Sequence, residues 1–196
     1  MNDYLSQHYI KYVNNLADLL SRLCGDEYFK QLCAAFMLIK EATENNRLII
    51  SCGNGGSASD SSHFAAELIC RFEKNRMPIK AISLATDLSV ISAISNDISY
   101  DNIFERQLNA LGAKNDILII FSTSGASRNC LEAAKTAKKN GLKIILFTGS
   151  QKTLIGQHSD VVVEAPSTRT CHIQEINRVQ YHLLCSWIES DMDHVR

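Results

Sequence analysis

The stretch Leu48–Arg71, LIISCGNGGSASDSSHFAAELICR, predicts the architecture of the chain around it. Its apolar start, Leu48–Cys52, is typical of a short strand that is buried on both faces. The GNGG segment that follows allows a tight turn and lets a ligand approach the backbone closely. Apolar residues recur at helical spacing from Phe64 to Ile69, and Ser57 is placed to cap that helix. A strand, a glycine turn and a helix N-terminus together are typical of an anion-binding site.

One turn into the predicted helix, His63 and Glu67 stand four residues apart. At about 100° per residue, they lie within roughly 40° of each other on one helix face. A pair of this kind is more often solvated or structural than catalytic. Its place just beyond an anion-binding turn makes it a candidate for chemistry.

The same pattern of strand, turn and helix recurs further along the chain. Asp116–Phe121 (DILIIF) predicts a buried strand, and the segment STSGAS, residues Ser122–Ser127, follows at once before a helix through Lys138. Such a loop offers hydroxyl groups as well as backbone N–H groups at a helix N-terminus. A serine-rich turn is often only a helix cap, but this combination favours a phosphate monoester site.

Further strands and helices complete an alternating pattern. This pattern predicts an α/β fold with a parallel sheet, helices on both faces, and ligands gathered at the carboxyl ends of the strands. The further predicted strands are Ile79–Leu84, Lys143–Thr148 and Val161–Glu164. Three further helices are predicted. The first is capped by Thr86-Asp87 and ends at Asn96-Asp97, the second covers Ile103–Leu111, and the third lies near the C-terminus.

Two amphipathic helices are predicted ahead of this core, over Tyr4–Leu23 and Tyr28–Glu44, joined around Gly25-Asp26. They could cover one face of the sheet or pair with another subunit. We favour subunit pairing, because an amphipathic helix pair outside the core needs a partner for its apolar face.

Composition excludes several classes of function. The 196 residues suffice for one domain, and a net charge of −1 provides no basic surface for nucleic acid or an anionic membrane. No apolar run approaches the length of a bilayer span, and Met1–Leu20 lacks the pattern of a secretory signal. Seven cysteines without CxxC spacing predict reduced thiols in a cytoplasmic protein: Cys24, Cys33, Cys52, Cys70, Cys130, Cys171 and Cys185.

Four segments together resemble one known family: CGNGGSASDSSHFAAEL, the pair Asn96-Asp97, FSTSGAS and IQEINRVQYH. The chain resembles the sugar-isomerase (SIS) fold, and within it the phosphoheptose isomerases, over nearly its whole length. The resemblance implies a three-layer fold with a five-stranded parallel sheet, preceded by the N-terminal helical pair. It divides the chain into N-terminal helices (1–45), an SIS domain (46–190) and a C-terminal tail (191–196).

The resemblance also implies an activity, the conversion of sedoheptulose 7-phosphate to D-glycero-D-manno-heptose 7-phosphate. That step leads to activated heptoses for cell-surface polysaccharide. Family members are typically cytoplasmic homotetramers with active sites between subunits, and many bind zinc.

Residue roles are implied by the same matches. Glu67 and His182 match the catalytic acid/base pair. The metal-binding positions are His63, Glu67, Gln174 and His182, which imply one Zn²⁺ per site. The substrate-binding positions are Asn54, Gly55, Gly56, Ser57, Arg71, Asn96, Asp97, Ser122, Thr123, Ser124, Ser127 and Gln174.

Some positions depart from the family pattern. Thr170-Cys171-His172 precedes the IQE segment where relatives commonly carry an arginine, and Asn177 stands where a histidine is frequent. The segment Gly149–Gly156 lacks the usual double glycine. These changes concern sugar specificity more than reaction type, and a modified heptose pathway, as for a capsule, is compatible with them.

Two other classes of protein share this fold. One is a non-catalytic SIS protein that binds the DNA-replication initiator; it loses the active-site carboxylate and terminal histidine, which this chain retains as Glu67 and His182. The other is a sugar-phosphate-sensing module, which usually carries a DNA-binding extension and a basic surface. The sequence favours the enzyme over both.

Overall fold

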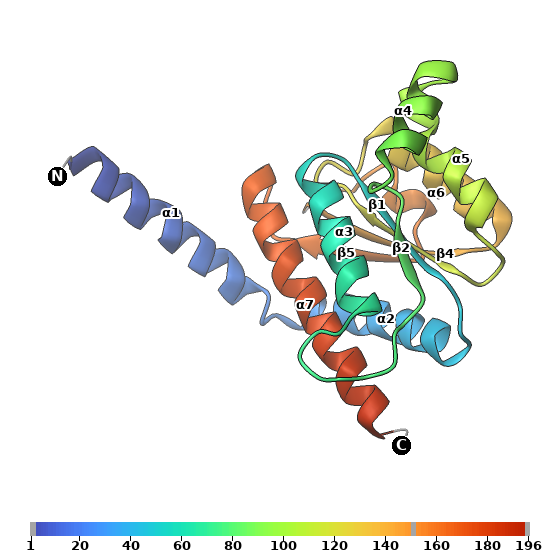
Figure 1. Ribbon diagram of the computed structural model, residues 1–196. Coiled ribbons are helices and arrows are strands. Elements are labelled where there is room, and N and C mark those ends of the chain that lie inside the picture. Colours follow the sequence, from blue (N-terminus) through green and yellow to red (C-terminus); the bar gives the residue numbers. More distant parts are fainter. Residues whose placement is uncertain (1–2, 150–151, 195–196) are drawn as a thin grey trace.

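The computed structural model describes residues 3–149 and 152–194, in which strands and helices alternate as predicted (Figure 1). The elements, in chain order, are α1 Asp3–Arg22, α2 Asp26–Glu44, β1 Ile49–Gly53, α3 Gly56–Ile69, β2 Ala81–Ser83, α4 Leu88–Asp97, η1 Tyr100–Asn102, α5 Ile103–Leu111, β3 Ile117–Phe121, α6 Arg128–Asn140, β4 Lys143–Gly149, η2 Gly156–His158, β5 Val161–Ala165 and α7 Thr170–His194.

The five strands form one parallel sheet in the order β2-β1-β3-β4-β5. The chain leaves β1 in one direction to form β2 and then returns to form β3 on the other side of β1. This reversal makes the gap between the ends of β1 and β3 a topological switch point, where α/β proteins bind ligands. The predicted fold class is therefore confirmed, and both predicted anion-binding loops follow strands that border the switch point.

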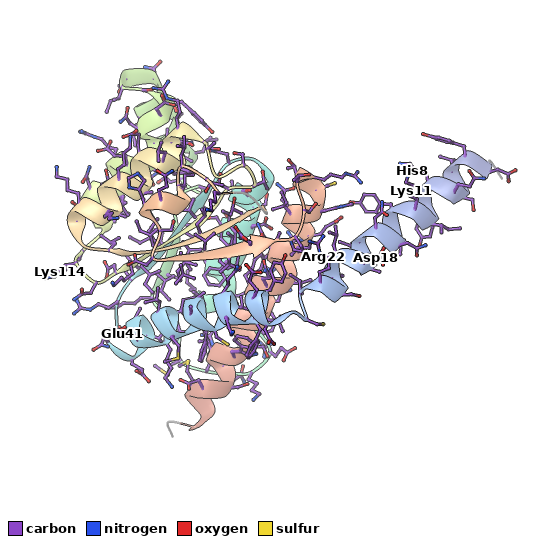
Figure 2. The ribbon with its side chains drawn as sticks, turned by 180° about the vertical axis from the view of Figure 1, so that it is seen from behind. His8, Lys11, Asp18, Arg22, Glu41 and Lys114 are labelled. Carbon is purple, nitrogen blue, oxygen red and sulfur yellow. The ribbon has the colours of Figure 1, made fainter. Side chains whose placement is uncertain are left out.

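Helix α1 extends away from the rest of the molecule, and Figure 2 shows its outer residues His8 and Lys11 far from the sheet. None of its residues is buried, and the large apolar side chains of its outer half are exposed. Its inner half packs against β5 and α7 through Leu16, Leu19, Leu20 and the following Leu23. The apolar face of α1 is thus largely uncovered in one chain.

Helix α2 behaves differently from the prediction, which placed both N-terminal helices outside the core. Leu32, Ala35, Ile39 and Ala42 of α2 are buried against the sheet. The sequence pattern did not separate the two helices because both are amphipathic. Only the packing distinguishes a helix that covers the sheet from one that leaves it.

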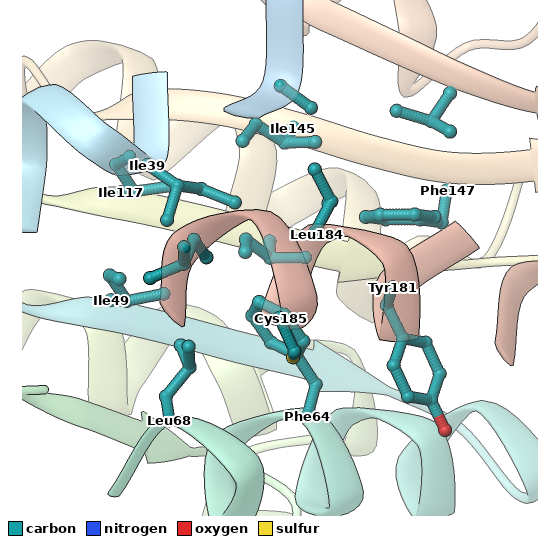
Figure 3. Close-up of a cluster of buried hydrophobic side chains, with 14 of the residues drawn as sticks. Ile39, Ile49, Phe64, Leu68, Ile117, Ile145, Phe147, Tyr181, Leu184 and Cys185 are labelled. Atoms are coloured by element: carbon teal, nitrogen blue, oxygen red, sulfur yellow. The ribbon is translucent and has the colours of Figure 1, made fainter. Parts of the chain in front are cut away.

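Two apolar clusters lie on the two faces of the sheet. Helices α2, α3 and α7 cover one face, where Phe64, Tyr181 and Leu184 pack on Phe121 and Phe147 of the strands (Figure 3). Helices α4, α5 and α6 cover the other face. Since α3 and α7 share a face and pack together, residues far apart in sequence meet between them.

Several finer predictions can be compared with the structure. Asp87 caps α4 by accepting a hydrogen bond of 3.0 Å from the N–H of Val90, and α4 ends at Asp97 as predicted. Helix α7 continues to His194, four residues into the segment predicted as a tail; residues 195 and 196 lie outside the described residues. All seven cysteines are free thiols, as predicted. Within the described residues, no helix is both long and apolar enough to cross a bilayer.

Candidate active site

The glycine turn, Gly53–Gly56, connects β1 to α3. Gly55 has a φ of +56° and is the N-cap residue of α3, which begins at Gly56. The predicted cap at Ser57 is therefore wrong: Ser57 is the second residue of the helix and is buried. The cap is a glycine because the chain needs a positive φ there, which a serine rarely adopts.

Gly53 allows β1 and α3 to approach each other closely. A Cβ atom at this position would lie 2.6 Å from the carbonyl oxygen of Ser57 and 2.8 Å from that of Phe121. We expect Gly53→Ala to lower the free energy of unfolding by about 1–3 kcal/mol, because both obstacles are backbone atoms. Urea denaturation measures this loss; Gly25→Ala, whose Cβ would lie 3.3 Å from its nearest atom, should cost less. Equal stability of Gly53→Ala and the wild type would contradict this view of the turn.

The imidazole–carboxylate cluster consists of His63, Glu67 and His182. Nε2 of His63 lies 2.8 Å from Oε1 of Glu67, so the predicted pairing on one face of α3 is observed. His182 reaches this pair from α7, and its ring centroid lies 5.2 Å from that of His63. The structure therefore brings together the two residues matched to the acid/base pair.

His182 is held in a restricted environment. Its ring packs against Tyr181 and against Phe72, with centroid distances of 4.8 Å and 5.4 Å. Burial lowers the pKa of His182 below its usual value, His63 adds to the effect, and Glu67 opposes it. The lowered pKa favours the neutral imidazole of His182, in which one ring nitrogen carries a proton and the other can accept one. Among the described residues its buried Nε2 has no hydrogen-bond partner.

The serine loop, Ser122–Ser127, follows β3 and leads into α6. Beside it lies a cavity of about 190 Å³ that is rich in hydroxyl groups, lined by Thr123, Ser124, Gly149, Ser167, Thr168, Thr170 and Ile173. The Oγ of Ser122 and the Oγ1 of Thr148 are buried without partners among the described residues. The first turn of α7 contributes Thr170 and Ile173, so the N-terminus of this helix adjoins the cavity. The hydroxyl groups that line the cavity, beside the N-terminus of α7, suit a phosphate group.

Sequence reasoning missed the far side of this cavity. Gly149, Ser167 and Thr168 come from the ends of β4 and the segment after β5, which carry no glycine-rich or serine-rich motif. They reach the serine loop because adjacent parallel strands end at the same edge of the sheet. The one signal that could have predicted these residues is that they follow strands which end at this edge of the sheet.

Asn54 of the glycine turn belongs to a hydrogen-bonded group that the sequence did not reveal. Its side-chain amide exchanges two hydrogen bonds of 2.8 Å with Asn129, and its oxygen accepts a third, of 2.9 Å, from the hydroxyl of Tyr100. These contacts connect the glycine turn to the start of α6. Asn54 is thus held in place by two residues that had no predicted role.

Three predicted substrate-binding residues lie on the surface. Asn96 donates a 2.7 Å hydrogen bond to the neighbouring Asp97 at the exposed end of α4. Arg71 is exposed and donates to Asn75. Within one chain, no described hydrogen bond or ion pair joins these residues to the serine loop or to the imidazole–carboxylate cluster.

Gln174 lies apart from the other predicted metal ligands. Its side-chain amide packs directly over Gly56, where a methyl group would collide with it. His182 contacts His63 instead, eight residues further along α7, which corresponds to about 12 Å of helix. Gln174 is therefore grouped with the glycine turn, while His63, Glu67 and His182 form a separate group.

Comparison with known proteins relates this geometry to a family. The family described as SIS domain matches residues 11–149. A phosphoheptose isomerase from Helicobacter pylori (strain P12) is 40% identical over 194 residues, which cover 99% of this chain and 98% of that protein. One from Bordetella avium (strain 197N) is 43% identical over 162 residues, which cover 81% of this chain and 82% of that protein.

The chain belongs to the phosphoheptose isomerase family of SIS-domain proteins. Solved structures of phosphoheptose isomerases agree. The protein from Francisella tularensis superposes with a TM-score of 0.90 at 28% identity, covering 97% of this chain and 100% of its own. GmhA from Neisseria gonorrhoeae superposes with a TM-score of 0.82 at 34% identity, covering 96% of this chain and 98% of its own. The resemblance predicted from the motifs is confirmed, and both leading helices fall within the span of these matches.

Proposed function

We propose that this phosphoheptose isomerase family member converts sedoheptulose 7-phosphate to D-glycero-D-manno-heptose 7-phosphate. The observation that carries the proposal is the meeting of Glu67 and His182 at His63, although 115 positions separate the first two in sequence. A carboxylate and a neutral imidazole side by side are the groups that an aldose–ketose isomerisation needs. The similarity to phosphoheptose isomerases supports a heptose as the sugar, and the cavity beside the serine loop supports the phosphate.

The reaction moves one proton between adjacent carbons through an enediol. In our assignment, the Glu67 carboxylate takes a proton from the carbon next to the carbonyl and returns it to the former carbonyl carbon. His182 moves a proton between the two oxygens, since a neutral imidazole can both donate and accept. Each group ends the cycle in its starting state, so the reaction needs no outside oxidant or reductant.

The distance along α7 favours active sites shared between subunits. Ile173 lines the hydroxyl-rich cavity beside the serine loop, and His182 joins the cluster nine residues, or about 13 Å, further along the helix. One seven-carbon sugar phosphate would have to span this distance and the width of both groups. A site that combines the cluster of one chain with the serine loop of a second chain shortens the path. The exposed apolar face of α1 supports such assembly, and we propose a homotetramer.

Subunit mixing tests this arrangement. Glu67→Gln removes the cluster's base, and Ser122→Ala with Thr123→Val weakens the loop of an otherwise intact chain. Random co-assembly of these two inactive proteins leaves about one site in four with a complete cluster and a complete loop. We expect activity to reappear in this mixture, but not in a mixture of Glu67→Gln with His182→Ala, because those residues come from the same chain. Activity in the mixture of Glu67→Gln with His182→Ala, and none in the first mixture, would overturn the shared-site arrangement. Light scattering separately gives the number of subunits.

Zinc fits the chemistry of the cluster. Two imidazole nitrogens and a carboxylate oxygen are ordinary zinc ligands, and the unpartnered Nε2 of His182 is available for one. In residues 3–149 and 152–194, no three His, Cys, Asp or Glu side chains already form a metal-binding group, so His63 would first have to release Glu67. A bound ion would polarise the substrate carbonyl. Gln174, the fourth predicted ligand, would have to come from a neighbouring subunit.

The decisive experiment incubates the purified protein with sedoheptulose 7-phosphate, with and without a chelator, and follows the aldose product by NMR. We expect conversion, and elemental analysis of the untreated protein reports the zinc content independently of activity. No conversion, together with tight binding of the DNA-replication initiator, would favour the non-catalytic alternative. The seven free thiols support our placement of the enzyme in the cytoplasm. We further propose that its product serves lipopolysaccharide or capsule synthesis.

A further inference from the structure

A pair of side-chain amides connects the two predicted anion-binding loops. Gly53 and Phe121 are partners at the ends of β1 and β3, so the glycine turn and the serine loop leave the sheet side by side. Asn54 lies in the glycine turn, and Asn129 lies at the start of α6, just after the serine loop. Nδ2 of each amide lies 2.8 Å from Oδ1 of the other. The pair therefore spans the topological switch point between the two strands.

The orientation of both amides follows from one backbone group. The N–H of Cys130, in the first turn of α6, donates to Oδ1 of Asn129 over 2.9 Å. The reverse assignment would set the nitrogen of Asn129 against this N–H, donor against donor. The nitrogen of Asn129 therefore donates to the oxygen of Asn54, and the nitrogen of Asn54 donates in return to Asn129. A single arrangement of the two amides satisfies all three hydrogen bonds.

Tyr100 completes the contacts of the Asn54 oxygen. Its hydroxyl, from η1, donates to Oδ1 of Asn54 over 2.9 Å, so this oxygen accepts two hydrogen bonds and both of its acceptor sites are occupied. The nitrogen of Asn54 has two N–H groups, of which one donates to Asn129. Among the described residues, the other reaches only Sγ of Cys130, a weak acceptor 4.0 Å away. Asn54 can therefore offer a ligand one donor and no free acceptor.

The two amides differ in their access to solvent. Asn129 is 2% exposed, whereas Asn54 is half-buried and adjoins the exposed Gly55 and Gly56. A buried amide without hydrogen-bond partners is unfavourable, so the burial of Asn129 keeps the pair together. The buried amide thus fixes the place of the one that a ligand can reach.

We propose that Asn129 is a positioning residue that holds the amide of Asn54, and with it the glycine turn, at a fixed place beside the serine loop. Tyr100 assists by occupying the Asn54 oxygen, which leaves an N–H for an oxygen atom of the ligand. The inference rests on the proposed function in taking a sugar phosphate as the ligand of this turn. Asn129 itself touches no substrate atom in this arrangement, and its effect passes through Asn54.

A double-mutant cycle in kcat/KM separates this role from general support of the fold. We expect Asn129→Ala and Asn54→Ala each to lower kcat/KM for sedoheptulose 7-phosphate about ten- to a hundredfold, because a misplacement of about 1 Å near a reacting substrate can cost that much. In the Asn54→Ala background, Asn129→Ala should change kcat/KM less than about twofold, since the residue that it positions is already missing.

Tyr100→Phe tests the same group of hydrogen bonds at an accessible position. Tyr100 is 53% exposed, so we expect this variant to fold. Loss of one hydrogen bond to the Asn54 oxygen should lower kcat/KM about two- to tenfold. The matched control is Asn140→Ala: Asn140 lies at the other end of α6 and donates to Asn109 over 3.1 Å in an exposed pair. The control loses the same kind of hydrogen bond away from the site and should keep wild-type kcat/KM.

Crystal structures of the wild type, Asn129→Ala and Tyr100→Phe give a readout that needs no turnover. We expect one conformer of Asn54 in the wild type and a displaced side chain in Asn129→Ala. If the wild type does not isomerise sedoheptulose 7-phosphate but Asn54 is displaced in this way, the proposed function fails and the positioning by Asn129 stands.

Two results would overturn the positioning role itself. The first is an Asn54 side chain that keeps its place in Asn129→Ala. The second is a full further loss of kcat/KM when Asn129→Ala is added to Asn54→Ala, because Asn129 would then act independently of Asn54. If Asn129→Ala does not fold, Tyr100→Phe decides, and an unmoved Asn54 with wild-type kcat/KM in that variant would overturn the proposal.

Discussion

Glu67→Gln is expected to lower the rate of isomerisation by about 10²–10⁴-fold, the usual contribution of a general base. The amide has nearly the shape of the carboxylate, but it cannot take a proton from carbon. Nε2 of His63, now 2.8 Å from Oε1, can still form a hydrogen bond with the amide, which both donates and accepts, so the fold and the subunit assembly should be retained. The measurement is the NMR assay with sedoheptulose 7-phosphate.

A matched control for this change is Glu132→Gln. Glu132 lies on α6 and pairs with Lys135 at 2.7 Å on the surface, so the same loss of charge occurs outside the candidate site. We expect this variant to keep wild-type activity. Full activity in Glu67→Gln would reject the assignment of the base, whatever the state of His182.

Glu189→Gln is expected to lower the free energy of unfolding by about 3–5 kcal/mol, the usual effect of removing one partner from a buried ion pair. The Glu189 carboxylate is 3% exposed and accepts backbone hydrogen bonds of 2.7–3.0 Å from Phe72, Glu73 and Lys74. It also lies 3.3 Å from Nε of the equally buried Arg76. The amide would leave that guanidinium without its counter-charge. Urea denaturation measures the loss, and a loss below about 1 kcal/mol, within the range of surface changes, would contradict the prediction.

The same carboxylate predicts a dependence of stability on pH. Burial acts to raise the pKa of Glu189, but the three backbone N–H groups and Arg76 outweigh it, and the net pKa lies below the ordinary value of 4.5. A carboxyl group with a lowered pKa in the folded state stabilises the protein fully above its unfolded pKa. That stabilisation is lost as the pH falls through the folded value. The difference in unfolding free energy between wild type and Glu189→Gln should therefore shrink below about pH 4.5. A difference that stays constant from pH 7 to pH 3 would rule out this linkage.

Glu189 also connects stability to the candidate site. The segment that it anchors begins with Phe72, whose ring packs on His182. Without the Glu189 carboxylate, Phe72 is held less firmly against the imidazole of His182. Partial loss of activity in Glu189→Gln is therefore expected alongside its lower stability, unlike Glu67→Gln, which should lose activity alone.

Most of the fold could be predicted from local signals. The strand at Asp116–Phe121, the cap at Asp87 and the helix Ile103–Leu111 are encoded by apolar periodicity and by capping chemistry among near neighbours. The predictions were wrong where the local sequence was compatible with two different structures. Ser57 is a good cap by composition, but the cap is Gly55, with its positive φ, and α3 begins two positions earlier than predicted. Helix α2 has the pattern of an interface helix, and only its place on the sheet shows that it belongs to the core.

The sequence by itself determined that His63 and Glu67 share a helix face beyond a glycine turn, because a four-residue spacing has only one outcome on an α-helix. It also determined that the serine loop follows a buried strand. The tertiary structure alone decided that α7 lies against α3, which brings Tyr181 and His182 to His63 and leaves Gln174 on Gly56. Contacts across 118 residues depend on how the apolar faces of whole helices pack, and no spacing within either helix carries that information.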